Sequence, residues 1–151
     1  MYIHVIRGEK TIRTQIQKIM EQLNQITYEI IGAAYKVHAA LGPGLLESAY
    51  EVCLEYELLK KGFKVERQKP LPVVYEDVKL EAGYRIDLLV EDAVIVELKA
   101  VEIIHPVYKA QLLTYMKLAE KPKGLLINFH TENITKGLTP LVNEIFAALP
   151  D

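Results

Sequence analysis

The stretch RIDLLVEDAVIVELK, from Arg85 to Lys99, places charged side chains inside two segments that are otherwise typical of buried β-strands. The apolar, β-branched residues 94–96 suit a central strand. A charged group there is costly unless a partner or a metal ion receives it. Side chains alternate along a strand, so Glu97 and Lys99 point to one face together. Asp87, Glu97 and Lys99 therefore need a physical explanation.

The turn between the two segments decides whether the carboxylates meet. A two-residue loop would place Asp87 opposite Val96, on the other face from Glu97. A three-residue loop, residues 91–93, places Asp87 directly opposite Glu97, with β-carbons about 5 Å apart. We predict the second register. Two carboxylates at that distance repel each other unless one is protonated or a cation lies between them. The pattern therefore predicts a divalent-metal site with a lysine beside it.

Asp87, Glu97 and Lys99 resemble the signature of the PD-(D/E)xK nuclease superfamily. The segment GLLESAY, residues 44–50, resembles the name-giving motif of one of its bacterial branches, the GxxExxY proteins. The resemblance runs from about Asn24 to about Leu141. It includes Val37-His38, Gly83-Tyr84-Arg85, Val96–Ala100, Ala110–Tyr115 and Gly124–Phe129.

The resemblance implies an α/β, restriction-endonuclease-like fold: an αβββαβ core with a mixed central sheet flanked by helices, plus N- and C-terminal helices. It divides the chain into an N-terminal extension, residues 1–19, expected to be helical, and a nuclease-like domain, residues 20–151.

The sequence pattern predicts where the elements lie. Helices are expected at about Lys10–Leu41, with a break near Asn24–Thr27 left open, and at Leu45–Lys61, Pro106–Leu118 and Leu138–Leu149. Strands are expected at Phe63–Gln68, Val73–Tyr75, Val78–Val90 with a bend at Gly83, Val94–Lys99 and Lys123–Phe129. The helix from Pro106 is expected to join parallel strands as a crossover.

The chemistry of the residues suggests the ligands and the metal. Hard cations prefer carboxylate and carbonyl oxygens, so Asp87, Glu97 and the Leu98 carbonyl suit Mg²⁺ or Mn²⁺. In related nucleases a helix glutamate helps to hold the metal, which assigns that role to Glu47. The four histidines lack the spacing of a zinc site.

Two further residues receive roles. Lys99 would orient an attacking water or stabilise the charge that develops on phosphorus. The resemblance to a Q-x-x-x-Y helix gives Gln111 a pocket-lining role beside Tyr115. An alternative stays open, in which Lys99 and Arg85 simply neutralise the two carboxylates in an ion-pair cluster.

These observations predict a Mg²⁺-dependent phosphodiesterase, a nuclease that acts on nucleic acid, with DNA as the expected substrate. One alternative is a non-catalytic module of the same fold that binds nucleic acid or protein. Another is a metal-dependent enzyme that acts on a different phosphate ester. The apolar stripe from Ile12 to Ile26 suits either a helical contact in a homodimer or a cover over the core.

Composition limits the remaining possibilities. A chain of 151 residues, half of them hydrophobic, fits one domain with a proper core. The single Cys53 excludes an intrachain disulfide. No apolar run approaches a membrane span of about 20 residues, and no signal peptide is evident, so we expect a cytoplasmic protein. Net charge is −2, so sequence-independent attraction of a polyanion would need bound metal or a local basic strip.

Overall fold

The computed structural model describes residues 2–81 and 83–144. Its helices are α1 (Tyr2–Leu41), α2 (Glu47–Lys60) and α3 (Pro106–Leu118), with a short 3-10 helix η1 (Ile134–Gly137). Its strands are β1 (Val65–Pro70), β2 (Val73–Tyr75), β3 (Val78–Leu80), β4 (Arg85–Val90), β5 (Val94–Lys99), β6 (Lys123–Asn128) and β7 (Leu138–Val142). The order α2-β1-β4-β5-α3-β6 is the predicted αβββαβ core.

The central sheet is mixed. Its strand order is β1-β4-β5-β6-β7. Strands β5 and β6 are parallel, from Val94 opposite Lys123 to Lys99 opposite Asn128, and the other neighbours are antiparallel. Helix α3 connects the two parallel strands, which confirms the predicted crossover.

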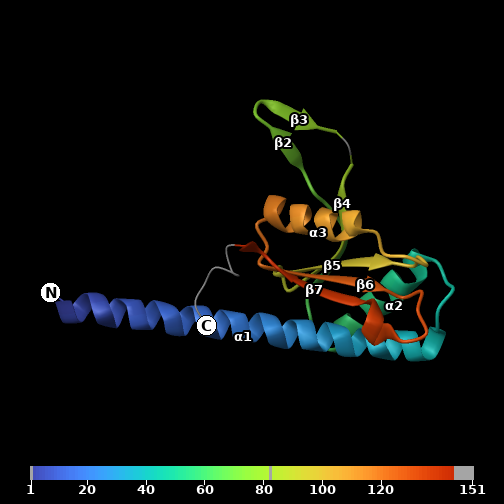
Figure 1. The fold of residues 1–151 in the computed structure, drawn as a ribbon, viewed down its shortest axis with the longest axis horizontal. Helices are drawn as coiled ribbons and strands as arrows, with labels where there is room; N and C mark the ends of the chain where they lie inside the picture. The colour runs from blue at the N-terminus through green and yellow to red at the C-terminus, as the bar shows by residue number, and fades with distance from the viewer. Residues whose placement is uncertain (1, 82, 145–151) are drawn as a thin grey trace.

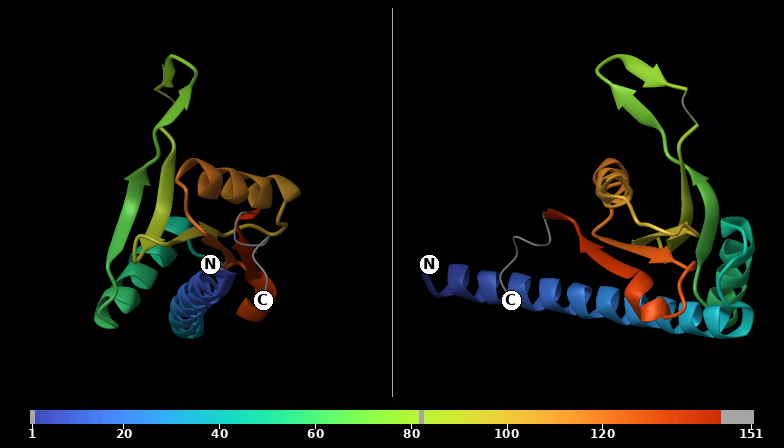
Figure 2. Two further views of the ribbon diagram at one scale, coloured as in Figure 1. Left: turned by 90° about the vertical axis from the view of Figure 1, so that its left-hand side faces the viewer. Right: turned by 45° about the vertical axis from the view of Figure 1, so that its right-hand side comes forward.

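Helices cover both faces of this sheet (Figures 1 and 2). Alternate residues of β5, Val94 and Val96, pack with α1 and α2 in one core cluster. Ile95, between them, packs with α3 in a second cluster. Gly124 of β6 lets α3 lie close, since a β-carbon there would stand 2.5 Å from the sulfur of Met116.

Helix α1 is continuous across the region where a break was left open. Thr27 does not begin a new helix, because its hydroxyl donates to the Leu23 carbonyl one turn back, at 2.8 Å. The side-chain oxygen of Asn24 instead accepts from Lys123. The helix includes residues 2–19, and this part projects beyond the sheet (Figure 1). The division of the chain at residue 19 stays a prediction.

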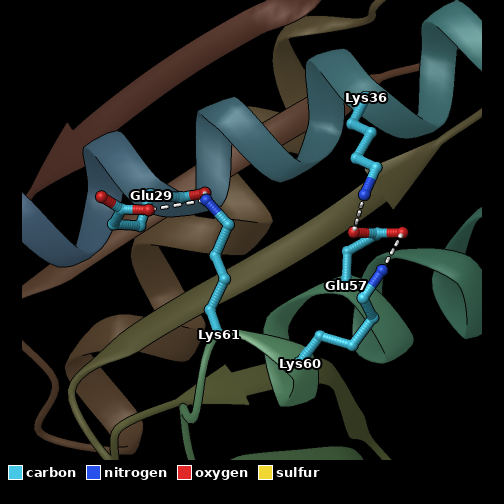
Figure 3. A network of polar contacts seen from close by, with 5 residues as sticks. All are labelled: Glu29, Lys36, Glu57, Lys60 and Lys61. Atoms are coloured by element: carbon cyan, nitrogen blue, oxygen red, sulfur yellow. Dashed lines mark hydrogen bonds and ion pairs between the residues drawn. The ribbon is translucent and has the colours of Figure 1, made fainter.

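Ion pairs join α1 to α2 (Figure 3). The Lys61 ammonium lies 2.6 Å from the Glu29 carboxylate, and Lys36 lies 3.0 Å from Glu57, which also meets Lys60 at 3.7 Å. The hydrogen bond from Lys61 lowers the pKa of Glu29. These pairs lie at the surface with their ammonium groups partly exposed, so they set the contact between the helices more than they stabilise the fold.

The single bent strand predicted for Val78–Val90 is wrong. It is two strands in different sheets: β3 pairs only with β2, in a two-stranded hairpin, and β4 belongs to the central sheet. Gly83, with φ +69°, lies in the segment that separates them. Because Gly adopts positive φ without steric cost, the chain changes direction there, and the β2–β3 hairpin stands away from the sheet (Figure 1).

The helix predicted from Leu138 is also wrong at its start. Leu138–Val142 form β7, an edge strand that pairs with β6 and places Pro140 opposite Leu125. A proline is tolerated on an edge strand because no ladder bond is needed from its nitrogen. Residues 145–149 of that predicted helix lie outside the described residues. No helix in the described part of the chain combines the length and apolar character needed to cross a bilayer.

Candidate active site

The β4–β5 hairpin has the register of a three-residue loop, as predicted. Val90 pairs with Val94, Leu89 with Ile95 and Leu88 with Val96. The loop uses two residues with positive φ, Glu91 at 54° and Asp92 at 53°, and the Ala93 N–H donates to the Val90 carbonyl at 3.1 Å. Asp87 and Glu97 are the next two residues outward from the last pair.

At Asp87 and Glu97, hydrogen bonds from the backbone of one strand to a side chain of the other take the place of the backbone ladder. The Asp87 N–H donates to the Glu97 carboxyl at 3.2 Å, and the Leu98 N–H donates to the Asp87 carboxylate at 2.9 Å. Each acidic side chain therefore bonds to the neighbouring strand. The two carboxyl groups, predicted to converge, are held together by these crossed hydrogen bonds.

Glu97 is almost completely buried, with 6% of its surface exposed. Burial raises its pKa to about 9, and the charge of nearby Asp87 contributes in the same direction. A carboxyl in that state keeps its proton at neutral pH unless a cation favours the ionised form. The site is therefore prepared to receive positive charge.

Asp87 lines a cavity of ≈ 480 Å³ that residues of the first turns of α2 also line. Leu98, whose carbonyl was a predicted ligand, lines it too, as does Glu47, the first residue of α2. Glu47 is exposed. The glutamate predicted from the helix thus shares a cavity with Asp87.

Two residues at this site, Glu51 and Gln68, were not predicted from the sequence. The Gln68 amide donates to the Glu51 carboxyl at 2.6 Å and to Asp87 at 3.3 Å, so it bridges α2 and β4. Gln68 has φ +53°, an uncommon backbone conformation for a residue other than glycine, at the point where this bridge forms. Burial raises the pKa of Glu51, and the charge of Asp87 adds to the effect.

One signal could have found Glu51. It occupies the helix face that Leu54 and Leu58 bury completely, so a carboxylate interrupts an apolar stripe. An acidic residue in such a position needs a polar partner.

Lys99 and Gln111 lie on the α3 side. The Lys99 ammonium stands 4.5 Å from the ring centre of Tyr108, a cation–π contact. The exposed Gln111 donates to the Tyr115 hydroxyl at 3.2 Å. Burial raises the pKa of Tyr115.

The ion-pair alternative is absent from the described residues. The Arg85 guanidinium donates to the Gln68 carbonyl at 3.1 Å. Neither Arg85 nor Lys99 forms an ion pair with the two carboxylates in this part of the chain. The charge of Lys99 acts against the rise in the pKa of Glu97, but no ion pair with these two cations closes the acidic pair in the described part of the chain.

The model of the PD-(D/E)XK nuclease superfamily matches residues 24–139. The chain belongs to this superfamily. Its matched region extends from α1 into β7 and contains every site residue described above. Comparisons with curated proteins and with solved structures found no match.

Members of the PD-(D/E)XK superfamily usually are nucleases and typically use Mg²⁺ or Mn²⁺, so the donor set can be tested against such an ion. Among the described residues, no three side chains of Asp, Glu, His or Cys gather closely enough to hold a metal by themselves. Asp87 and Glu97 supply two carboxylates, with the Leu98 carbonyl beside them. This partial set of oxygen ligands fits Mg²⁺, which commonly keeps several waters.

Proposed function

We propose that this protein is a metal-dependent nuclease that hydrolyses phosphodiester bonds, with DNA as its substrate. The observation that supports it most is the crossed pair of Asp87 and Glu97, which lies within the region that the superfamily model matches and resembles the signature of that superfamily. The preference for DNA over RNA rests on the sequence resemblance. We further propose that the chain belongs to the GxxExxY branch.

Asp87, Glu97, Glu47 and the Leu98 carbonyl would hold Mg²⁺ or Mn²⁺. The chemistry supplied there is polarisation of a phosphoryl oxygen and a lowered pKa of bound water. Glu97 would lose its proton when it becomes a ligand. Glu51, through Gln68, would keep the Asp87 carboxylate in position.

Lys99 would leave the Tyr108 ring and donate a hydrogen bond to the attacking water or to a phosphoryl oxygen. The new bond from water to phosphorus forms as the bond to the leaving oxygen breaks, in line on the opposite side. An ammonium that contacts the phosphate only as charge develops lowers the barrier more than it strengthens binding.

The superfamily model accounts for residues 24–139, and we propose that target choice depends on a partner or on dimerisation. Residues 1–19 would be an extension to the domain formed by residues 20–151, and exposed Ile12 and Ile19 on α1 would provide a contact for a homodimer. The cytoplasmic location stays a prediction.

The test is cleavage of single-stranded, duplex and branched DNA, with an RNA series in parallel, in Mg²⁺ or Mn²⁺. We expect hydrolysis that EDTA stops. Lys99→Ala should slow it by orders of magnitude, because the lost contact acts in the transition state, and should leave the melting temperature close to that of the wild type. Lys36→Ala, which removes an ammonium from the network of Figure 3, is the matched control and should cut normally.

Two results would reject the proposal. One is clean protein that cuts nothing in the panel, which would favour the non-catalytic binding module. The other is Lys99→Ala protein that cuts as fast as the wild type. Hydrolysis of small phosphate esters without cleavage of any polynucleotide would point instead to a different phosphoesterase.

A further inference from the structure

A second cavity, of ≈ 540 Å³, lies between the β2–β3 hairpin and α3. Three tyrosines line it, Tyr84, Tyr108 and Tyr115, and we call it the tyrosine groove. Aliphatic side chains complete its walls, Val73 and Leu80 from the hairpin among them. Within the described residues its lining contains no charged side chain, although Gln111 and Thr114 provide polar groups. Such a lining suits an uncharged, flat and largely apolar group.

The rings are arranged so that aromatic surface remains available. Tyr84 and Tyr115 meet edge to face, with ring centres 6.3 Å apart and planes at 68°. Tyr115 is buried, whereas Tyr84 keeps 43% of its surface exposed. Tyr108 receives the Lys99 ammonium at 4.5 Å and is half-buried. A ligand in the groove would therefore contact tyrosine rings, with the Lys99 ammonium at the edge of the groove.

The groove adjoins the candidate active site at Lys99. This proposed catalytic lysine contacts Tyr108, which lines the groove. Asp87 lines the other cavity, together with Glu47 and Glu51 of α2. The candidate site residues thus border one cavity with acidic residues and one with aromatic residues.

We propose that the tyrosine groove holds an unpaired base of the nucleotide next to the phosphodiester bond that is cut. This inference rests on the proposed nuclease function and names its substrate class: nucleic acid with unpaired nucleotides, in place of uninterrupted duplex. A phosphate would avoid the uncharged groove and meet Lys99, while a base, which has a π-face whatever its identity, stacks on tyrosine. A base inside a duplex is already stacked on both sides and cannot enter.

The first measurement uses the wild-type protein in EDTA, so that no strand is cut. Fluorescence anisotropy would compare three labelled DNAs of equal length: a single strand, the same strand with abasic sites in its centre, and a blunt duplex. We expect the protein to bind the intact single strand about tenfold or more tightly than either of the other DNAs. The abasic strand has no base to stack on tyrosine at its centre, and the bases of the duplex are paired and unavailable. Phosphates are the same in the intact and abasic strands.

Variants then locate the effect. Tyr84→Leu with Tyr108→Leu should weaken binding of the intact strand by about 5- to 150-fold and abolish the preference over the abasic strand. Tyr84→Phe with Tyr108→Phe keeps both rings and should retain the preference. Tyr56→Leu, at a tyrosine of α2 that is 61% exposed, is the control and should bind as the wild type does.

The outcomes distinguish failure of the base-binding inference from failure of the proposed nuclease function. Equal binding of intact and abasic strands overturns the inference, whether or not the protein cuts DNA. Base-dependent binding through the two tyrosines without cleavage in Mg²⁺ or Mn²⁺ supports the groove and rejects the nuclease. A wild-type dimer that the leucine variant converts to monomer, with binding of the single strand unchanged, would assign the groove to a second copy of this chain and overturn the inference.

Discussion

Replacing Tyr50 by phenylalanine should destabilise the protein by an amount that its contacts define. Tyr50 is fully buried, and its ring stacks on Phe129 with centres 4.5 Å apart. The hydroxyl donates to the Gly42 carbonyl at 2.6 Å and accepts from the Leu45 N–H at 3.1 Å. The tyrosine hydroxyl therefore links α2 to the glycine turn that precedes it. Phenylalanine removes both hydrogen bonds but keeps the stacked ring.

Each of these hydrogen bonds contributes about 0.5–1.5 kcal/mol, so the substitution should cost about 1–3 kcal/mol. Gly42 is half-buried and Leu45 is 43% exposed, so water can partly satisfy the freed groups, which favours the lower half of that range. For a chain of this size, the melting temperature should fall by about 2–12 °C. Activity should fall modestly, because the same turn leads into Leu46 and Glu47 at the cavity that Asp87 lines.

Thermal and urea unfolding followed by circular dichroism would measure the effect, with Tyr56→Phe on the exposed side of the same helix as the control. An unchanged melting temperature for Tyr50→Phe would refute the reasoning. Loss of cleavage without loss of stability would show that the hydroxyl acts in the chemistry.

Two further predictions concern the metal site and the N-terminal extension. Mn²⁺ at a hundredfold excess over its Kd should stabilise the wild type by about 2.7 kcal/mol in thermal unfolding. Asp87→Asn should abolish this stabilisation. Asp92→Asn, in the exposed turn of the same hairpin, is the control and should retain it. A chain that begins at Met20 should still fold, because the first buried side chain described in α1 is Leu23, and should lose self-association in sedimentation experiments.

Each of these predictions has a clear contrary result. Equal melting shifts in wild type and Asp87→Asn would remove the carboxylate from the metal site. Unfolding of the shortened chain would show that residues 1–19 belong to the core. Unchanged self-association would show that the dimer contact lies outside residues 1–19.

The sequence was informative where two independent constraints met at one position. The β4–β5 register followed from the charges of Asp87 and Glu97 together with strand alternation, and a shift by one residue would have placed one of them on the wrong face. Helix α3 followed from Pro106 and an apolar pattern that continues to Leu118. The αβββαβ order was implied by the family resemblance, whereas the local pattern alone merged β3 and β4 into one strand.

Other features depend on contacts between distant segments. Leu138 and Leu141 are three residues apart, a spacing that favours one face of a helix. Only pairing with β6 makes this segment an edge strand, in which the two leucines pack on opposite faces of the sheet. Gln68 gave no sign of its role, because its bridge between Glu51 and Asp87 joins three elements. The direction of Lys99 toward Tyr108 likewise depends on how α3 lies across the sheet.

The position of the β2–β3 hairpin has a consequence for how such a protein can diversify. The chain leaves the central sheet after Pro70 and returns at Arg85, and these two residues are paired in the β1–β4 ladder. At the neck of the insertion the Leu71 N–H donates to the Tyr84 carbonyl at 2.8 Å. Residues 71–84 can therefore change in length and composition without shifting the strands that carry Gln68 and Asp87. Mutation can remodel one wall of the tyrosine groove while the carboxyl pair stays in place, so substrate preference and chemistry are free to evolve at different rates.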